Sequence, residues 1–290
     1  VLYGADAVYL GYAAYSARAG AGNFDEQQLR DAVRFAHLHH VRVHVTVNTL
    51  IKDGEMAGVV DVLRLLSEIR VDAVLVQDLG VLRMARRCFP DLPIHASTQM
   101  AIHNATGVRF CRNQGMTRAV LARECSAAEI ALAAKEDIEI EVFGHGAQCV
   151  AVSGECLFSS VVGGRSGNRG RCAQPCRLLY TYRGKTAAWL SPRDVCMRDD
   201  LPELNKAGVA SIKLEGVPLF TVRNEKIILR HIFAVALSDF FAKQVDVYNS
   251  NNADVLLSGD GWERFCAYLS SKPEHLKDVL KASIPVSMHR

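Results

Sequence analysis

Val71-Asp72-Ala73-Val74-Leu75-Val76-Gln77-Asp78 is the stretch that decides the fold class, because a turn, an apolar strand and a polar end follow one another within it. The same order returns at residues 4–11, 116–123 and 208–215, and further apolar runs lie at 41–47, 93–96 and 138–143. Strands that are apolar at nearly every position are typical of parallel sheets, which are buried on both faces. The chain is therefore predicted to contain a parallel sheet.

Helical segments are predicted between these strands, at residues 25–39, 56–69, 79–88 and 127–135. Ser126, followed three residues later by Glu129, is a capping box that marks the start of the last of them. Strands alternating with helices indicate an α/β protein, and so many in a row favour a TIM-type (β/α) barrel over an open sheet. Residues 1–4 resemble the tail of a helix, so we expect a barrel that lacks its first βα unit.

The 290 residues are expected to form two parts. Residues 1–216 would be the barrel, with a cysteine-rich loop at 144–196, and residues 217–290 an atypical, mainly helical segment. A hydrophobic content of 49% suits a soluble globular protein, and no apolar run is long enough to predict a membrane span. Nine cysteines, an odd number, with no signal peptide in front of Val1 indicate a reducing compartment, and we expect the cytoplasm.

Polar side chains stand where the apolar strands end, which is where a barrel carries its chemistry. Asn48, Gln99 and Arg123 are the candidates for holding a small ligand, and Glu141 and His145 are the candidates for catalysis. Each alone could be a helix cap or a turn residue. Polar residues at six strand ends favour a polar pocket. The further members of this set are Gln77, Asp78, Ser97, Thr98, Glu124 and Glu215. Arg123 is suited to a carboxylate, which a guanidinium binds through two parallel hydrogen bonds.

Five cysteines lie close together in the chain: Cys149, Cys156, Cys172, Cys176 and Cys196. The glycine-rich run at 163–170 lies among them and allows the chain to fold back, so that the thiolates can meet. We predict that four of them bind an iron–sulfur cluster, with [4Fe–4S] as the first choice. Either Cys176 or Cys196 would be the fourth ligand. Zinc is a weaker alternative, because structural zinc sites usually show two short Cys-x-x-Cys knuckles.

The same loop is basic. It carries Arg165, Arg169, Arg171 and Arg177 and has no acidic residue near them, which is a pattern that can hold phosphates. The alternative is a solvated loop that happens to be basic. No aromatic stacking platform for nucleic acid bases is evident in the sequence.

Several long motifs resemble peptidase family U32, long catalogued as collagenase-like proteases. They are the stretch from Glu141 through Cys149 to Ser160, the run from Gly164 to Arg177, residues 4–11 with 16–18, and residues 191–196 with 201–204. The resemblance covers residues 1–216 and departs from the family after Gly216, where Val217 replaces the usual arginine.

The resemblance implies a [4Fe–4S] protein that hydroxylates RNA, forming 5-hydroxycytidine in rRNA or 5-hydroxyuridine in tRNA with prephenate as co-substrate. The basic loop would then bind the RNA, and the polar pocket would bind the carboxylate. A peptidase is the first alternative, for which His145 with Cys149 is the one candidate pair, since neither a His-Glu-x-x-His nor a Gly-x-Ser-x-Gly motif is present. A non-catalytic iron–sulfur scaffold is the second.

Overall fold

The computed structural model describes residues 4–19 and 22–215. The chain divides into two compact units, Val1–Gly216 and Val217–Arg290, and every described residue belongs to the first. The helical segment expected at 217–290 lies outside the described residues, as does any strand before residue 4.

The core of the fold is a parallel sheet whose strands follow one another in the order of the sequence. It runs through β1 (Ala7–Gly11), β2 (Arg42–Val47), β3 (Ala73–Val76), β4 (Ile94–Ala96), β5 (Arg118–Val120), β6 (Glu139–Gly146) and β10 (Ser211–Leu214). The predicted α/β class with a parallel sheet is confirmed. A short antiparallel strand, β9 (Val195–Cys196), pairs with the end of β6.

The sheet curls until its two ends approach each other. Lys213 on the last strand places its Nζ atom 4.1 Å from the ring centroid of Tyr9 on the first. Sequential parallel strands that curl in this way give the arrangement of a (β/α) barrel. Among the described residues the sheet is a half-barrel, and the complete TIM barrel expected from the sequence is not confirmed.

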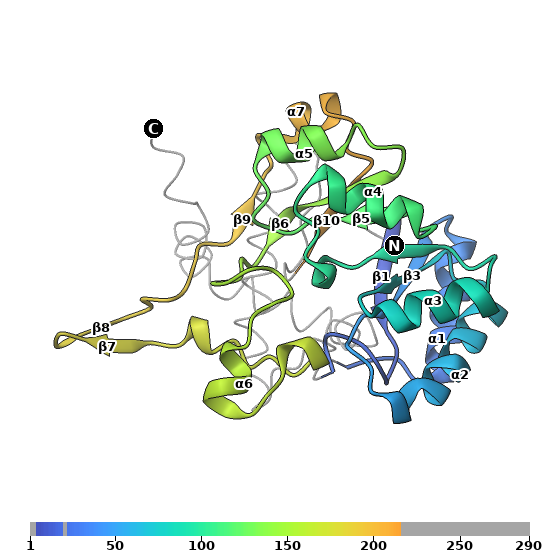
Figure 1. Cartoon of the computed structure of the whole chain (residues 1–290), viewed down its shortest axis with the longest axis horizontal. Helices are drawn as coiled ribbons and strands as arrows, with labels where there is room; N and C mark the ends of the chain where they lie inside the picture. Colours follow the sequence, from blue (N-terminus) through green and yellow to red (C-terminus); the bar gives the residue numbers. More distant parts are fainter. Residues whose placement is uncertain (1–3, 20–21, 216–290) are drawn as a thin grey trace, which may run out of the picture. The chain divides into compact units, whose positions relative to one another are not determined.

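Helices connect the parallel strands (Figure 1). They are α1 (Glu26–Leu38), α2 (Met56–Glu68), α3 (Leu79–Cys88), α4 (Ala105–Asn113), α5 (Ala127–Ala133) and α7 (Leu201–Lys206). The predicted capping box is present, since Ser126 accepts a hydrogen bond from the Glu129 amide at the start of α5. Asp78, expected among the strand-end pocket residues, instead caps α3 by accepting from the amides of Gly80 and Val81.

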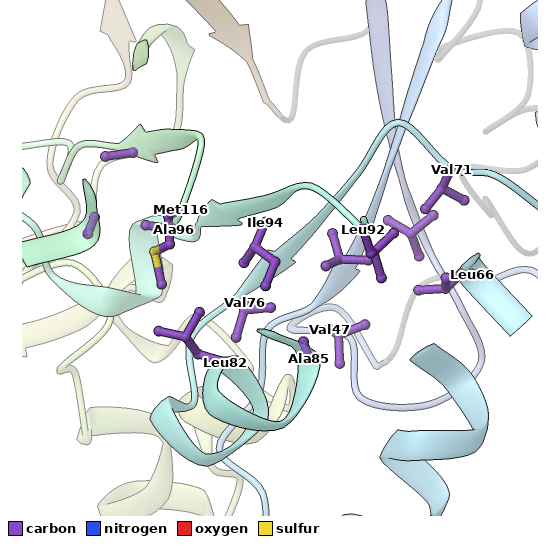
Figure 2. Packing of buried hydrophobic residues seen from close by; sticks show 14 of the residues in the cluster. Val47, Leu66, Val71, Val76, Leu82, Ala85, Leu92, Ile94, Ala96 and Met116 are labelled. Atoms are coloured by element: carbon purple, nitrogen blue, oxygen red, sulfur yellow. The ribbon is translucent and has the colours of Figure 1, made fainter. Parts of the chain in front are cut away.

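The hydrophobic core lies between these helices and one face of the sheet. Val43, Val45 and Val47 alternate along β2 and are fully buried on that face. Figure 2 shows the strand residues Val76 and Val47 beside Leu82 and Ala85 of α3. Full burial of one such side chain stabilises the fold by about 1.5–3 kcal/mol, so this layer supplies the rigid frame for the opposite, inner face of the sheet.

The inner face carries polar and charged side chains around a small buried apolar cluster of Leu75, Val120 and Phe143. Because successive side chains on a strand point to opposite faces, His44 and Thr46 of β2 turn inward between the three valines. The remaining members of this face include Tyr9, Leu75, His95, Ser97, Arg118, Val120, Glu141, Phe143 and Lys213.

A long excursion separates β6 from β9, at residues 147–194. It contains α6 (Phe158–Gly163), two short 3-10 turns at Gly167–Arg169 and Pro175–Arg177, and a hairpin of β7 (Tyr180–Tyr182) and β8 (Lys185–Ala187). Figure 1 shows this hairpin projecting from the rest of the described chain. Within the described residues, no helix combines the length and apolarity that crossing a bilayer requires.

Candidate active site and cysteine loop

A cavity of about 340 Å³ opens at the carboxyl ends of the parallel strands. The ligand-binding candidates Asn48, Gln99 and Arg123 all line it. Glu215, which the sequence placed in the polar pocket, lines it too. Tyr9, Arg18, Phe143 and Lys213 also line it, although the sequence did not single them out for this role. Three cations and one carboxylate, Glu215, therefore line the cavity and leave an excess of two positive charges.

Glu215 joins two of the cations. Its Oε1 accepts from Arg18 Nη2 at 2.5 Å, and its Oε2 accepts from Arg123 Nη2. Burial opposes ionisation of Glu215, but the charges of Arg123 and Arg18 outweigh it and lower its pKa. Arg123 was expected to bind the carboxylate of a ligand, and in this structure the carboxylate of Glu215 occupies that position.

One hydrogen-bond donor of Arg123, its Nε–H group, has no partner among the described residues. The Nε atom is buried. The guanidinium carbon lies 4.2 Å from the ring centroid of Phe143, a cation–π contact that fixes the plane of the group. A buried donor without a partner costs about 1–3 kcal/mol, so a ligand acceptor at this point would be favoured.

Glu141 lies on the inner face but does not line the cavity. It accepts from Arg118 Nη1 at 2.9 Å, from Ser211 Oγ at 3.0 Å and from Lys213 Nζ at 3.3 Å. Burial opposes its ionisation, yet Lys213 and Arg118 lower its pKa to about 2. Glu141 is therefore a permanent anion that holds Lys213 in place, and its predicted place among the pocket-lining residues is not borne out.

Tyr9 faces Lys213 from the first strand. Burial and the nearby charge of Glu215 raise the pKa of the Tyr9 phenol to about 12. The phenol therefore stays protonated at neutral pH and offers the cavity a neutral hydrogen-bond donor. His145, the second catalytic candidate, does not line the cavity; it stands at the end of β6 opposite Cys196, and its carbonyl accepts from the Glu215 amide at 3.0 Å.

The polar wall of the cavity is tied together by Asn48. Its Oδ1 accepts from the Ala17 amide at 2.9 Å, and its Nδ2 donates to Ser97 Oγ at 3.0 Å. The first of these bonds holds the loop that carries Arg18. Asn48 therefore shapes the cavity, with both ends of its amide already engaged.

The cysteine-bearing segments fold toward one another. Cys156 lies near enough to Cys149 to help burial raise the pKa of the Cys149 thiol. A Cβ atom built on Gly167 would lie 3.5 Å from the Cys156 carbonyl oxygen and 3.7 Å from Cys172 Cβ. The Gln174 amide donates to Cys172 Sγ at 3.4 Å. Cys149, Cys156, Cys172 and their two companions are free thiols, but no three Cys, His, Asp or Glu side chains of the described chain are already arranged around a metal position.

Both candidates for a fourth ligand are held close to these segments. Arg177, the neighbour of Cys176, donates through Nη2 to the Gln148 carbonyl at 3.1 Å, directly beside Cys149. Cys196 lies on β9, in register with His145 at the end of β6. Cys196 thus belongs to the sheet and lies outside the loop proper, and the choice between the two stays open.

The four loop arginines divide into two kinds. Arg169 donates to Glu55 at 2.5 and 2.7 Å and to the Leu50 carbonyl, and Arg177 donates to Ser191, Pro192 and Asp194. Both are occupied in fastening the loop, which removes them from the predicted phosphate-binding set. Arg165 and Arg171 remain exposed.

Comparison with known proteins identifies the family. Residues 1–247 match the profile of peptidase family U32. The chain belongs to peptidase family U32. The match runs past residue 216, so the expectation that the family resemblance ends there is wrong.

This U32 chain is similar to proteins with two kinds of name. It is 37% identical over 230 residues to the tRNA hydroxylation protein P1 of Bacillus subtilis, which covers 74% of the chain and 54% of that protein. It is 39% identical over 224 residues to the 23S rRNA 5-hydroxycytidine C2501 synthase of Escherichia coli, with coverages of 74% and 34%. It is also 36% identical over 233 residues to an uncharacterized protease of Methanocaldococcus jannaschii, with coverages of 74% and 56%.

The chain spans about half the length of two of these relatives and about a third of the other. Within this U32 domain, Arg18, Tyr9 and Lys213 are the cavity residues that sequence reasoning missed. Lys213 had a signal, because it is the one charged residue in the apolar run Ser211–Leu214. Arg18 belongs to the motif at residues 16–18 that carries the family resemblance, but nothing in the local sequence shows that it reaches Glu215 across 197 positions.

Proposed function

We propose that this U32 chain takes part in the hydroxylation of RNA, forming 5-hydroxycytidine in rRNA or 5-hydroxyuridine in tRNA. The observation that carries the proposal is the cavity with two excess positive charges and the unpartnered Nε of Arg123. It suits a small dianion, the charge state of a dicarboxylate such as prephenate. The names of the relatives from Bacillus subtilis and Escherichia coli supply the RNA chemistry.

The cavity residues have separate tasks in this proposal. Arg123 and Arg18 would bind one carboxylate of the co-substrate, and Lys213 the other. Glu215 would keep the two arginines aligned until the ligand arrives, because its carboxylate already bridges them. Tyr9 would donate a hydrogen bond from its hydroxyl without ionising, since its pKa is about 12.

The cysteine loop fits an iron–sulfur cluster by the chemistry of its donors. Cys149, Cys156 and Cys172 with either Cys176 or Cys196 would supply four thiolates, and the Gln174 amide already donates to one sulfur. A bound [4Fe–4S] cluster would supply electron transfer. Gln148 joins loop and cavity, because it precedes Cys149 and its Nε2 donates to the Arg123 carbonyl at 3.3 Å.

The test is to express the chain in an Escherichia coli strain that lacks its own tRNA and rRNA hydroxylation proteins. Mass spectrometry of nucleosides from purified tRNA and 23S rRNA should show 5-hydroxyuridine or 5-hydroxycytidine restored. Cys156→Ala is the matched negative control, and Cys88→Ala, a free and exposed cysteine outside the loop, is the matched positive control. If neither modified nucleoside rises above its level in the empty-vector strain, the proposal is refuted.

Iron content tests the cofactor separately. Anaerobically purified protein should contain about four iron and four sulfide per chain and should lose both in Cys156→Ala. Comparing Cys176→Ala with Cys196→Ala identifies the fourth ligand, because only the true ligand lowers the iron content. Zinc in place of iron would remove the cluster from the proposal.

A peptidase is the second candidate, because of the protease name of one relative. The nucleophile candidate that the sequence offers for it is Cys149, paired with His145. Partial desolvation raises the pKa of the Cys149 thiol, and the neighbouring Cys156 adds to this effect, although Arg123 opposes it. Nucleophilic cysteines have lowered pKa values, so the structure disfavours this role. Cleavage of casein or gelatin that is lost in Cys149→Ser would restore it.

A further inference from the structure

The β7–β8 hairpin exposes large aromatic side chains on a short projecting element. Tyr182 is 58% exposed and Trp189, just after β8, is 46% exposed. Their ring centroids lie 6.3 Å apart at an interplanar angle of 83°. An isolated two-stranded hairpin is only marginally stable in water. Large aromatic side chains that are exposed together on such an element indicate a site where a partner binds.

A cation lies over each of these rings. The guanidinium carbon of Arg183 is 5.1 Å from the Tyr182 centroid, and Nζ of Lys185 is 5.6 Å from the Trp189 centroid. Arg183 and Gly184 form the two-residue turn, and both have positive φ angles, 47° and 73°. This is the turn geometry that matches the twist of a tight hairpin. Arg183 in the turn and Lys185 directly after it lie over the aromatic rings.

The charge of the surrounding chain indicates the kind of partner. Residues 156–193 contain seven basic residues and no acidic residue. Sequence-tolerant binding of single-stranded nucleic acid needs cations for the phosphates and aromatic faces for the bases. Two copies of the same acid-free surface would repel each other, which disfavours self-association through the hairpin. The aromatic platform that the sequence did not reveal is thus formed by folding.

The hairpin is fastened to the cysteine loop and, through it, to the cavity. Tyr180 donates to the Pro175 carbonyl at 2.8 Å, on the 3-10 turn that contains Cys176. Arg177 binds Ser191 beyond the hairpin and the carbonyl of Gln148. Gln148 also donates to the Arg123 carbonyl. The same hydrogen bonds therefore connect a nucleic acid strand bound at the hairpin to the cavity.

We propose that the β7–β8 hairpin is an RNA-binding element, in which Tyr182 and Trp189 stack on unpaired bases while Arg183 and Lys185 contact the flanking phosphates. The proposal rests on the proposed function, from which it takes RNA as the substrate. It moves the main RNA contact away from the glycine-rich loop.

Binding is tested with the full chain and a fluorescein-labelled single-stranded RNA of mixed sequence, about sixteen nucleotides long, followed by anisotropy. Trp189→Ala and Tyr182→Ala should each raise Kd by about 5- to 150-fold, the range for loss of one stacked base. Phe35→Ala is the matched control, because Phe35 is 47% exposed and also packs on a neighbouring ring, that of His39, but lies on α1. It should leave Kd unchanged, and Trp189→Phe should restore most of the affinity.

Two further readouts separate contact from folding. Arg183→Gln with Lys185→Gln should reduce the slope of log Kd against log salt by about 1.4, as expected for two lost phosphate contacts on a single strand. A Trp262→Phe variant leaves Trp189 as the only tryptophan of the chain, and RNA should quench its fluorescence. Stacking on a base requires this quenching, whereas a merely structural role of Trp189 does not.

The outcomes are distinct. If the parent protein binds the RNA but the hairpin variants bind equally well and Trp189 is not quenched, the hairpin proposal is wrong and the proposed function stands. If the parent binds neither this RNA nor total tRNA nor 23S rRNA, both are wrong. If sedimentation shows a dimer that Trp189→Ala converts to a monomer without changing RNA affinity, the hairpin is a protein interface and the proposal is overturned.

Discussion

Replacing Glu141 by glutamine tests how the cavity is held together. Glu141 is 6% exposed and lies between Arg118 and Lys213, whose side chains are 4% and 9% exposed. The substitution preserves size and most of the hydrogen-bonding capacity but removes the one buried negative charge that these two cations share. Arg118 keeps Glu139, whereas no other ion pair is recorded for Lys213 among the described residues.

The expected loss of stability can be estimated in two ways. The pKa of Glu141 falls from an ordinary value of 4.5 to about 2, which corresponds to about 3 kcal/mol of preference for the folded state at neutral pH. Removing one partner of a buried ion pair generally costs about 3–5 kcal/mol. Glu141→Gln should therefore lower the free energy of unfolding by about 3–4 kcal/mol, a large part of the total for a typical domain.

The assay is urea unfolding at pH 7, with the midpoint compared at equal slope. Glu139→Gln is the matched control, because Glu139 binds the same Arg118 at 2.6 Å but is 50% exposed. An exposed ion pair is worth about 0–1 kcal/mol, so this variant should stay close to the parent. Equal losses in the two variants, or a loss below about 1 kcal/mol in Glu141→Gln, would refute the reasoning.

The pH dependence supplies a second check. Because the folded-state pKa lies below the unfolded one, the contribution of Glu141 is complete above about pH 5 and is lost as the pH falls toward 2. The difference between parent and Glu141→Gln should shrink over that range. A difference that stays constant with pH would mean that the effect is one of packing.

Three other predictions follow from the site. Arg123→Lys keeps the charge but loses the planar pair of donors, so calorimetry should show at least about tenfold weaker binding of a dicarboxylate such as malonate or prephenate. Burial lowers the pKa values of His44 and His95 to about 4 and about 3. Because the unfolded state therefore takes up protons first, the melting temperature should fall as the pH drops from about 6.5 toward 4. Ring resonances that titrate near pH 6.5 in the folded protein would contradict this. Arg169→Ala should lower the melting temperature but leave RNA affinity unchanged, in contrast to the exposed Arg171→Ala, which should weaken RNA binding at low salt.

The sequence predicted the strands well because buried strands contain many apolar residues within a short segment. Val43, Val45 and Val47 are buried on one face, and they alternate with His44 and Thr46 of the inner face, which are buried too. Helix α4 was not predicted, since only Val108 and Cys111 of its nine residues are buried, which leaves a weak apolar stripe. Its start is marked instead by Asn104, whose side chain caps the Gly107 amide.

The cavity could be predicted only as far as strand order determines it. Parallel strands end at one edge, so polar residues after them meet there, and Asn48, Gln99 and Arg123 do so. Whether an inward residue reaches the cavity depends on its depth along the strand. Glu141 pairs in register with Ser211, one layer below the cavity, and no periodicity within β6 alone shows this.

The basic loop shows why counting charges was insufficient. An acid-free stretch indicates either a phosphate site or a solvated basic loop, but Arg169 forms an ion pair with Glu55, 114 positions away in the sequence. Only the fold separates cations that are occupied from cations that are available. Once Arg169 and Arg177 are assigned to anchoring, the exposed cations Arg183 and Lys185 are the ones that lie over exposed aromatic rings. Phosphate contacts and base stacking thus become available on a single element, and that coincidence is the reason to look for RNA at the hairpin before the glycine-rich turn.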